Sequence, residues 1–468
     1  MRRVLTTGVT LLAAASAVSA VTALFKGQEQ VRPRGESEEA SRRSQAAEQS
    51  IDFEALAAVP SKSAVAPGFD SERVWGTLND WEPSIAADPV APYVYQMTTR
   101  YNGPAPCKGC NGPWIVFRRS SDAGSTWGPD KYLTAKKGAF NDPEVEVATD
   151  GTIYAAYLNG YNPGVSFVKS TNRGDAWSTP IALTQGAAPP AWSDKPILAI
   201  SEDGQDVYVG LNASDSYVVA SHNRGVSFAN PVKTNSDSRY WFHTGGAVAP
   251  NGTVYFAAVD YTQTYAGDSH INVLRSTDGG QSWNTTRIDT SAEMPGCSWS
   301  PGCYLGFLGP SAALAVDADG NVMVAYHAGA SAGSPQRMFV RTSADGLNWS
   351  ARVEVGATSG TVNHALPALA AGPVGGDFRL AFQDDRNGSQ TAWNTWYRTT
   401  TNGGASWGAA VRLSDKGSGA SYKSAAGYRF PYGDYFELAV DSAGLAHAIW
   451  GEGMSYDGPG GTWYTRGN

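Results

Sequence analysis

The sequence predicts an all-β protein whose fold is a β-propeller of seven four-stranded blades. An eight-residue pattern recurs six times, and seven apolar strand entries recur at similar intervals along the chain. The 53 glycines and 26 prolines among 468 residues suit many short strands joined by turns. Repeats of this kind are typical of an array of similar small sheets. With 42% hydrophobic and 11% aromatic residues, the chain can bury a sizeable core.

The recurring pattern, called the box here, is Ser/Thr-x-Asp/Asn-x-Gly-x-x-Trp. Each position has a physical reason: the Asp or Asn side chain bonds backbone N–H groups, glycine accepts positive φ, and the aromatic ring packs back onto the sheet. The copies start 50, 51, 55, 66 and 58 residues apart, and those at 221 and 342 are weaker: Ser120–Trp127, Ser170–Trp177, Ser221–Phe228, Ser276–Trp283, Thr342–Trp349 and Thr400–Trp407.

The box resembles the Asp-box, or bacterial neuraminidase repeat, of sialidase-like β-propellers. The resemblance covers residues 64–468. It implies a propeller with box hairpins at the rim of the blades. In that family the box is structural, so the motif indicates the fold but not the chemistry of the protein.

Seven repeat units can be aligned on the residue that enters the first strand. Their spacings are 60, 53, 50, 64, 57 and 68, for entries at Pro83, Pro143, Pro196, Gly246, Pro310, Pro367 and Tyr435. The seventh unit ends one strand short, so we expect residues 72–76 to supply its outer strand and close the ring. Six blades with an irregular last unit is the alternative.

The N-terminal residues predict export. Arg2 and Arg3 precede an apolar run that ends in a small-residue cleavage site at Val18-Ser19-Ala20. We expect residues 1–20 to be a signal peptide, with an uncleaved anchor as the alternative. Residues 21–63 are expected to be a disordered spacer or propeptide, and residues 64–468 the propeller.

The four cysteines form two local pairs in the sequence. Cys107 with Cys110, and Cys297 with Cys303, are expected to be short disulfides that pin long loops of a secreted protein. One zinc held by all four thiolates is the alternative.

The charge of the chain bears on its partners. A net charge of −8 and the lack of a basic run argue against nucleic acid. No apolar stretch after the N-terminus is long enough to span a membrane. The sequence predicts a secreted monomer that binds a glycan or polysaccharide, without a cofactor or a metal site.

A propeller places the loops that enter the first strands on the same face as the loops joining the second and third strands. That face is expected to gather acids, arginines and aromatic residues such as Trp81 and Trp241, which suits sugars. The candidate substrate-binding residues on it are Arg100, Asp194, His243, His364, Arg386, Arg429 and Asp434. The structural alternative is that these groups cap turns or pair with one another.

The resemblance also implies what an exo-sialidase would need. Its members combine an arginine triad, a Tyr nucleophile paired with a Glu, and an Asp acid–base. Candidates for the arginine clamp by loop position are Arg100, Arg239, Arg386 and Arg429. The family's Arg-Ile-Pro motif is absent, and seven units differ from its six blades; both departures count against sialidase activity.

Four residues are the candidate catalytic groups. Tyr435 and Glu437 occupy alternate positions of one strand, as nucleophile and base. Asp142 and Glu144 flank Pro143 and are expected, by the same alternation, to point to one side together. Alternatively, Asp434 caps a turn and Tyr435 packs in the core.

Three functions remain open from the sequence. The first is a sialidase-like glycoside hydrolase that uses two carboxyl groups or a Tyr–Glu pair. The second is a non-catalytic propeller that binds a glycan or a protein. The third is a polysaccharide lyase with a Tyr or His base, for which His243, His327 and His364 are candidates.

Overall fold

The structure, a computed structural model, describes most of the chain from residue 66 onward. The described residues are 66–75, 80–101, 103–110, 112–133, 138, 140–159, 164–184, 194–264, 266–296, 309–356, 358–389, 392–415, 419–421, 436–453 and 460–467. The predicted signal peptide and spacer, together with Cys297, Cys303, Arg429, Asp434 and Tyr435, lie outside them.

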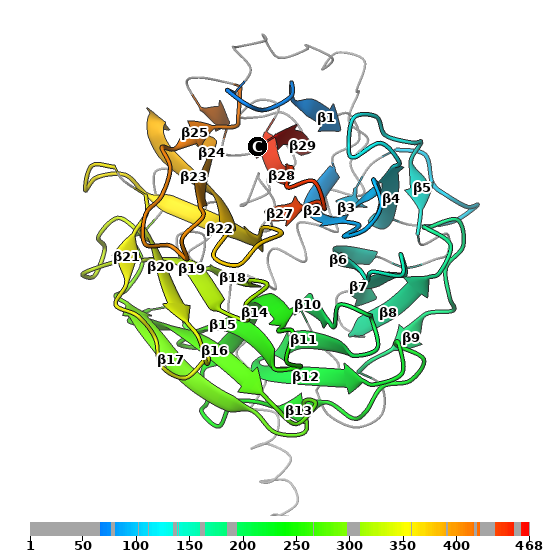
Figure 1. Ribbon diagram of the computed structural model, residues 1–468, viewed down its shortest axis with the longest axis horizontal. Helices are drawn as coiled ribbons and strands as arrows, with labels where there is room; N and C mark the ends of the chain where they lie inside the picture. Colours follow the sequence, from blue (N-terminus) through cyan, green and yellow to red (C-terminus); the bar gives the residue numbers. More distant parts are fainter. Residues whose placement is uncertain are drawn as a thin grey trace, which may run out of the picture.

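The described strands form seven antiparallel blades in a ring (Figure 1); five are separate four-stranded sheets, and the last two are joined into one nine-stranded sheet. Blade 1 consists of β2 (Asp80–Ala87), β3 (Val94–Arg100), β4 (Trp114–Ser120) and β5 (Lys131–Tyr132). Blade 2 consists of β6 (Phe140–Val147), β7 (Ile153–Asn159), β8 (Val165–Ser170) and β9 (Ile181–Ala182). Blade 3 consists of β10 (Asp194–Ile200), β11 (Val207–Ala213), β12 (Asp215–Ser221) and β13 (Val232–Lys233).

The next three blades continue the same plan. Blade 4 consists of β14 (Tyr240–Val248), β15 (Val254–Tyr261), β16 (Ser269–Ser276) and β17 (Asn284–Ser291). Blade 5 consists of β18 (Ala312–Val316), β19 (Val322–Ala328), β20 (Arg337–Ser343) and β21 (Val353–Glu354). Blade 6 consists of β22 (His364–Ala371), β23 (Phe378–Ser389), β24 (Ala392–Thr400) and β25 (Val411–Arg412).

Blade 7 joins the two ends of the described chain. It consists of β27 (Glu437–Val440), β28 (Ala446–Gly453), β29 (Gly460–Gly467) and the N-terminal strand β1 (Arg73–Trp75). Short β26 (Ala420–Ser421) bridges blades 6 and 7 by pairing with β24 and β28. The predicted seven blades and the closure by the N-terminal segment are confirmed, and the six-bladed alternative is wrong.

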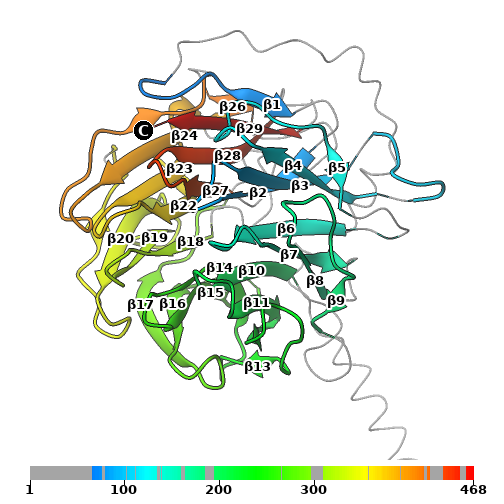
Figure 2. The same cartoon turned by 45° about the vertical axis from the view of Figure 1, so that its right-hand side comes forward.

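Aromatic contacts reinforce the closing strand. The Trp75 ring lies edge-on to Trp127 of blade 1 at 5.4 Å, and 6.1 Å from Tyr464 of β29. The Arg118 guanidinium of blade 1 lies 4.8 Å from the Trp75 ring centre. Figure 2 shows β1 beside β29 at this seam between the last and first blades. These contacts tie blade 7 to blade 1.

The hydrophobic core lies between neighbouring blades. One cluster joins β7 and β8 of blade 2 to β10, β11 and β12 of blade 3, and similar clusters lie between other pairs. Each sheet is therefore buried on both faces, which explains why strands such as β7 carry almost no polar side chains. In the described part of the chain, no helix has the length and apolarity needed to cross a membrane.

The six predicted box turns share one set of hydrogen bonds. In the second, the Gly174 N–H donates to the Ser170 hydroxyl at 2.9 Å, and the Asn172 side-chain oxygen accepts the Ala176 N–H at 2.8 Å. In the fifth copy the Gly346 N–H donates to the hydroxyl of Ser343, three residues earlier instead of four, so this turn is one residue shorter. At each turn the side-chain oxygens thus accept backbone N–H groups that would otherwise bond a neighbouring strand.

The box glycines also bring neighbouring blades together. A Cβ on Gly174 would lie 2.3 Å from the Phe117 ring of blade 1, and one on Gly225 would lie 2.5 Å from the Phe167 ring of blade 2. Each of these turns therefore sits directly on an aromatic side chain of the preceding blade. Glycine is required there both for its positive φ and for this close approach.

Candidate functional site

A cavity of about 150 Å³ lies at the centre of the ring. The first strand of every blade contributes to its wall. Three carboxyl side chains project from these strands, namely Glu144 and Glu146 of β6 and Glu437 of β27. Two of them, Glu144 and Glu437, are among the residues predicted to be catalytic.

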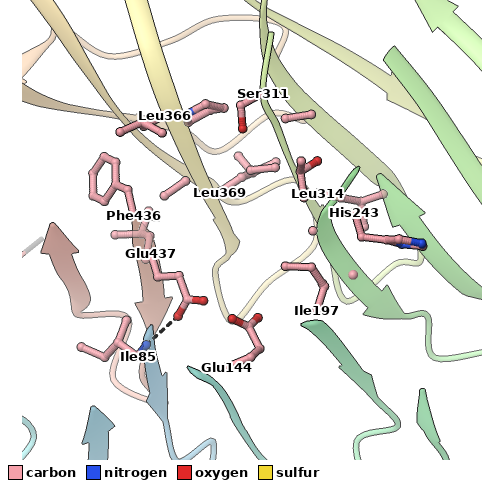
Figure 3. A pocket seen from close by; sticks show the side chains of 18 of the residues that line it. Ile85, Glu144, Ile197, His243, Ser311, Leu314, Leu366, Leu369, Phe436 and Glu437 are labelled. Atoms are coloured by element: carbon pink, nitrogen blue, oxygen red, sulfur yellow. Dashed lines mark hydrogen bonds between the residues drawn. The ribbon is translucent and has the colours of Figure 1, made fainter. Parts of the chain in front are cut away.

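Glu144 and Glu437 meet at one side of the cavity, although they belong to blades 2 and 7. Figure 3 shows their carboxyl groups pointing toward one another. The two groups share a hydrogen bond, and the Ile85 N–H of blade 1 donates to Glu437 Oε2 at 2.5 Å. A further backbone N–H, from Leu198 of blade 3, bonds Glu144. Backbone N–H groups of blades 1 and 3 therefore hold the two carboxyl groups in place.

Burial of the pair alters its protonation. Glu144 is only 8% exposed. Burial, and then the neighbouring Glu437, raise the pKa of Glu144 well above its ordinary value. Burial also raises the pKa of Glu437. Two carboxyl groups in contact cannot both ionise without strong repulsion, so the pair holds one shared proton near neutral pH.

Glu146 is a functional candidate that the sequence analysis missed. It lies two residues beyond Glu144 on the same strand, and it also lines the cavity. Burial, followed by the charge of Glu437, raises the pKa of Glu146 to about 8. The alternation of Glu144 and Glu146 in the sequence was the signal that could have indicated it.

Asp142 does not lie on the same face of β6 as Glu144, so the prediction from strand alternation is wrong. The pairing of β6 with β7 shifts between Asn141 and Glu144, so one extra residue is inserted there. Asp142 itself has a φ of 53°. Because a bulge shifts the alternation by one residue, Asn141 rather than Asp142 shares the face of Glu144. The Asp142 N–H donates instead to Thr99 of blade 1 at 3.0 Å.

The described candidate arginines are held by acids of their own blades. Arg100 bonds both oxygens of Asp80 in blade 1, at 2.7 and 2.9 Å. In blade 6, the Arg386 guanidinium lies 2.6 Å from Asp384.

The third arginine follows the same pattern, since Arg239 forms an ion pair with Asp260 in blade 4. The structure thus places Arg100, Arg239 and Arg386 in three separate blades, with their donor groups engaged by protein carboxylates. A clamp for a ligand carboxylate needs such donors to converge on one anion.

The candidate histidines are buried and neutral. The His243 ring points away from the carboxyl pair in Figure 3, and its Nε2 lies 2.7 Å from the Ser216 hydroxyl of blade 3. His364 donates from Nδ1 to the Gln336 carbonyl at 3.0 Å. Burial lowers the pKa of both residues to about 3. Both rings are therefore uncharged groups that join neighbouring blades.

The remaining candidates have separate positions. Asp194 begins β10 opposite Asn212, ahead of another register shift, in a different blade from the carboxyl pair. Trp81 and Trp241, expected as sugar platforms, are only 1% and 3% exposed and belong to the packed interior. A disulfide joins Cys107 to Cys110 in the loop between β3 and β4. Among the described residues, no group of three His, Cys, Asp or Glu side chains is arranged to hold a metal ion.

Comparisons with known proteins concern the fold. No protein-family model matches the chain, and no curated protein matches it. Solved structures that resemble it include a protein of unknown function from Dyadobacter fermentans, with 12% identity, a TM-score of 0.48, and coverage of 86% of this chain and 100% of that one. Another is the Hadza microbial sialidase Hz136, with 12% identity, a TM-score of 0.46, and coverage of 87% and 94%.

A third similar structure is a polysaccharide lyase, a PL25 ulvan lyase bound to a saccharide. Its identity to this chain is 12%, its TM-score is 0.48, and the alignment covers 83% of this chain and 95% of that one. The similar structures therefore include both a sialidase and a polysaccharide lyase. The chemistry of this chain has to be argued from its own residues.

Proposed function

We propose that this protein is an exported, carbohydrate-active glycoside hydrolase that works through Glu144 and Glu437 in the central cavity. The observation that carries the proposal is the hydrogen-bonded carboxyl pair assembled from blades 2 and 7 in that cavity. A protonated and an ionised carboxyl group side by side are the two groups that glycoside hydrolysis needs.

The reaction follows from the shared proton. The Glu144 carboxyl donates its proton to the glycosidic oxygen while the bond from that oxygen to the anomeric carbon breaks. The Glu437 carboxylate attacks the anomeric carbon and forms a glycosyl ester. Glu144, now ionised, takes a proton from water, whose oxygen attacks the same carbon and releases Glu437 as a carboxylate. The products are an alcohol and a sugar hemiacetal, and Glu144 regains its proton.

The separation of the pair favours retention of the anomeric configuration. Retaining enzymes hold their carboxyl groups about 5–5.5 Å apart, and inverting enzymes about 6.5–9.5 Å apart. A hydrogen-bonded pair is closer than either class. Placing the scissile C–O bond between the two groups, with its oxygen at Glu144 and its anomeric carbon at Glu437, widens the pair toward the shorter of the two separations.

The size of the cavity favours an exo-acting enzyme. Its volume of about 150 Å³ leaves room for no more than about one sugar ring, since an engineered cavity of roughly that size holds a single benzene molecule. A terminal sugar ring would therefore enter the cavity and the rest of the glycan would remain outside. An exo-sialidase-like specificity, with Arg429 and Tyr435 as further groups, remains a prediction that the described residues leave untested.

The test is a screen of the purified protein against sialosides, neutral glycosides and uronic-acid polymers. We expect release of a terminal sugar, and loss of at least a hundredfold in rate in Glu144→Gln and in Glu437→Gln. Glu202→Gln is the matched control, because Glu202 is exposed on a turn between β10 and β11. Folded variants that keep full activity would overturn the proposal. Binding without bond cleavage would instead support the non-catalytic alternative, and an unsaturated product would support the lyase.

A further inference from the structure

Ser84 of blade 1 lies where blades 1, 2 and 7 meet, beside the carboxyl pair of Glu144 and Glu437. It belongs to β2 of blade 1 and is 1% exposed. On one side its oxygen accepts the Val145 N–H of blade 2 at 2.9 Å. On the other side its hydroxyl is hydrogen-bonded to Glu437 of blade 7. The residue therefore touches the strand of one carboxyl group and the side chain of the other.

The direction of these hydrogen bonds follows from the chemistry of a hydroxyl. Ser84 has a single proton to give, and the Val145 N–H can only donate. The bond from Val145 therefore uses a lone pair of Ser84, and the hydroxyl proton is left for Glu437. Glu437 is thus the acceptor in this contact, which suits a carboxylate.

The two members of the pair differ in the number of donors they receive. Apart from the hydrogen bond that they share, Glu437 accepts from Ser84 and from the Ile85 N–H, whereas Glu144 accepts one backbone N–H, from Leu198. Hydrogen bonds to an ionised carboxylate stabilise the ionised form. The shared proton therefore resides on Glu144, and the negative charge on Glu437.

We infer that Ser84 is a positioning residue that keeps Glu437 ionised and aimed into the cavity, and so assigns the acid role to Glu144 and the nucleophile role to Glu437. The inference rests on the proposed hydrolase function for the roles, but the distribution of the proton can be tested without any substrate.

The test compares Ser84→Ala, Ser84→Thr and Thr98→Val. Thr98 provides the matched control, because its buried hydroxyl bonds the Trp81 carbonyl in the same blade at 2.6 Å and faces the Thr462 hydroxyl of blade 7 at 3.5 Å, and neither of these partners is a carboxyl group of the pair. Ser84→Thr restores the hydroxyl. The protein is labelled with ¹³C at the side-chain carboxyl of glutamate, and the Glu437 signal is assigned by its loss in Glu437→Gln.

We expect Ser84→Ala to raise the pKa of the Glu437 carboxyl by about one pH unit, because an ionised acceptor loses a donor. The acid limb of the pH–rate profile should move upward by the same amount, and kcat should fall about tenfold near that limb with KM changing less than about twofold. Ser84→Thr should return both values toward those of the wild type, and Thr98→Val should leave them unchanged.

Equal titration of Glu437 in the wild type and Ser84→Ala would overturn the inference, as would an equal shift in Thr98→Val. If no glycoside is cleaved by the wild-type protein, the proposed function fails. The carboxyl titration still decides the role of Ser84 in that case, so the two failures are distinguishable.

Discussion

A glycine-to-alanine change in a box turn should cost much more stability than the same change in an ordinary turn. Gly174 of the second box turn has a φ of +80°, and a Cβ there would lie 2.3 and 2.4 Å from two atoms of the Phe117 ring. Gly252, in the turn between β14 and β15, has a φ of +81° with nothing within 4 Å of a Cβ. The two positions therefore share the backbone conformation and differ in the space available.

The expected magnitudes follow from these two terms. Placing an L residue in the left-handed region costs about 1–2 kcal/mol at either position. Only Gly174→Ala adds a clash with a buried ring, since Phe117 is 0% exposed and overpacking a core costs roughly 1–3 kcal/mol. Gly174→Ala should therefore lower the free energy of unfolding by about 2–5 kcal/mol, and Gly252→Ala by about 1–2 kcal/mol.

The assay is chemical denaturation followed by tryptophan fluorescence, with the melting temperature as a second measure. The double variant Gly174→Ala/Phe117→Leu makes room for the new methyl group, so its loss should be smaller than the sum of the two single losses. Equal losses in Gly174→Ala and Gly252→Ala, or strict additivity in the double variant, would refute the idea that box glycines serve close approach between blades.

Two further predictions concern the seam and the cavity. Trp75→Ala should destabilise the protein by roughly 2–4 kcal/mol and make residues 66–75 sensitive to protease, because it removes the ring contacts across the seam. Arg73→Ala, at an exposed position of the same strand, removes only the contact of Arg73 with the Trp75 ring at 5.2 Å and should cost about 0.5–1 kcal/mol. The same loss in both variants would contradict this. The second concerns Glu146, whose pKa rises from its ordinary 4.5 to about 8 in the folded protein. Its contribution to stability is therefore fully present below about pH 4.5 and is lost as the pH rises through 8, by on the order of 2 kcal/mol after discounting for partial exposure. Melting temperatures between pH 4 and 9 should fall less steeply in Glu146→Gln than in the wild type, and parallel curves would exclude this role.

The scaffold could be predicted from the sequence because its determinants are local and repeated. A box turn such as Ser170–Trp177 contains its own hydrogen-bond donors and acceptors, so its residues specify it wherever it occurs. The closing strand could be predicted because β27, β28 and β29 leave one edge of blade 7 unpaired until β1 fills it.

The candidate site could be predicted only in part, because it depends on long-range geometry. The position of Glu144 and of Glu437 at a strand entry indicates each residue by itself, but nothing in the sequence links two residues so far apart. Asp142 departs from simple strand alternation because of the bulge before Glu144, which is not visible in the residue pattern. Ser84 resembled an ordinary strand residue, and its importance follows from the three blades that it joins.

The position of the carboxyl pair links the closure of the ring to the proposed chemistry. Glu437 belongs to the last blade, but Ile85 and Ser84, which hold its carboxylate, belong to the first. The seam that β1 closes with Trp75 and Arg118 is the same seam across which these hydrogen bonds run. If the seam separates by even a few tenths of an ångström, the short bond from Ile85 weakens and the charge on Glu437 loses support. The N-terminal strand therefore stabilises the site as well as the fold, although it contributes no side chain to the cavity.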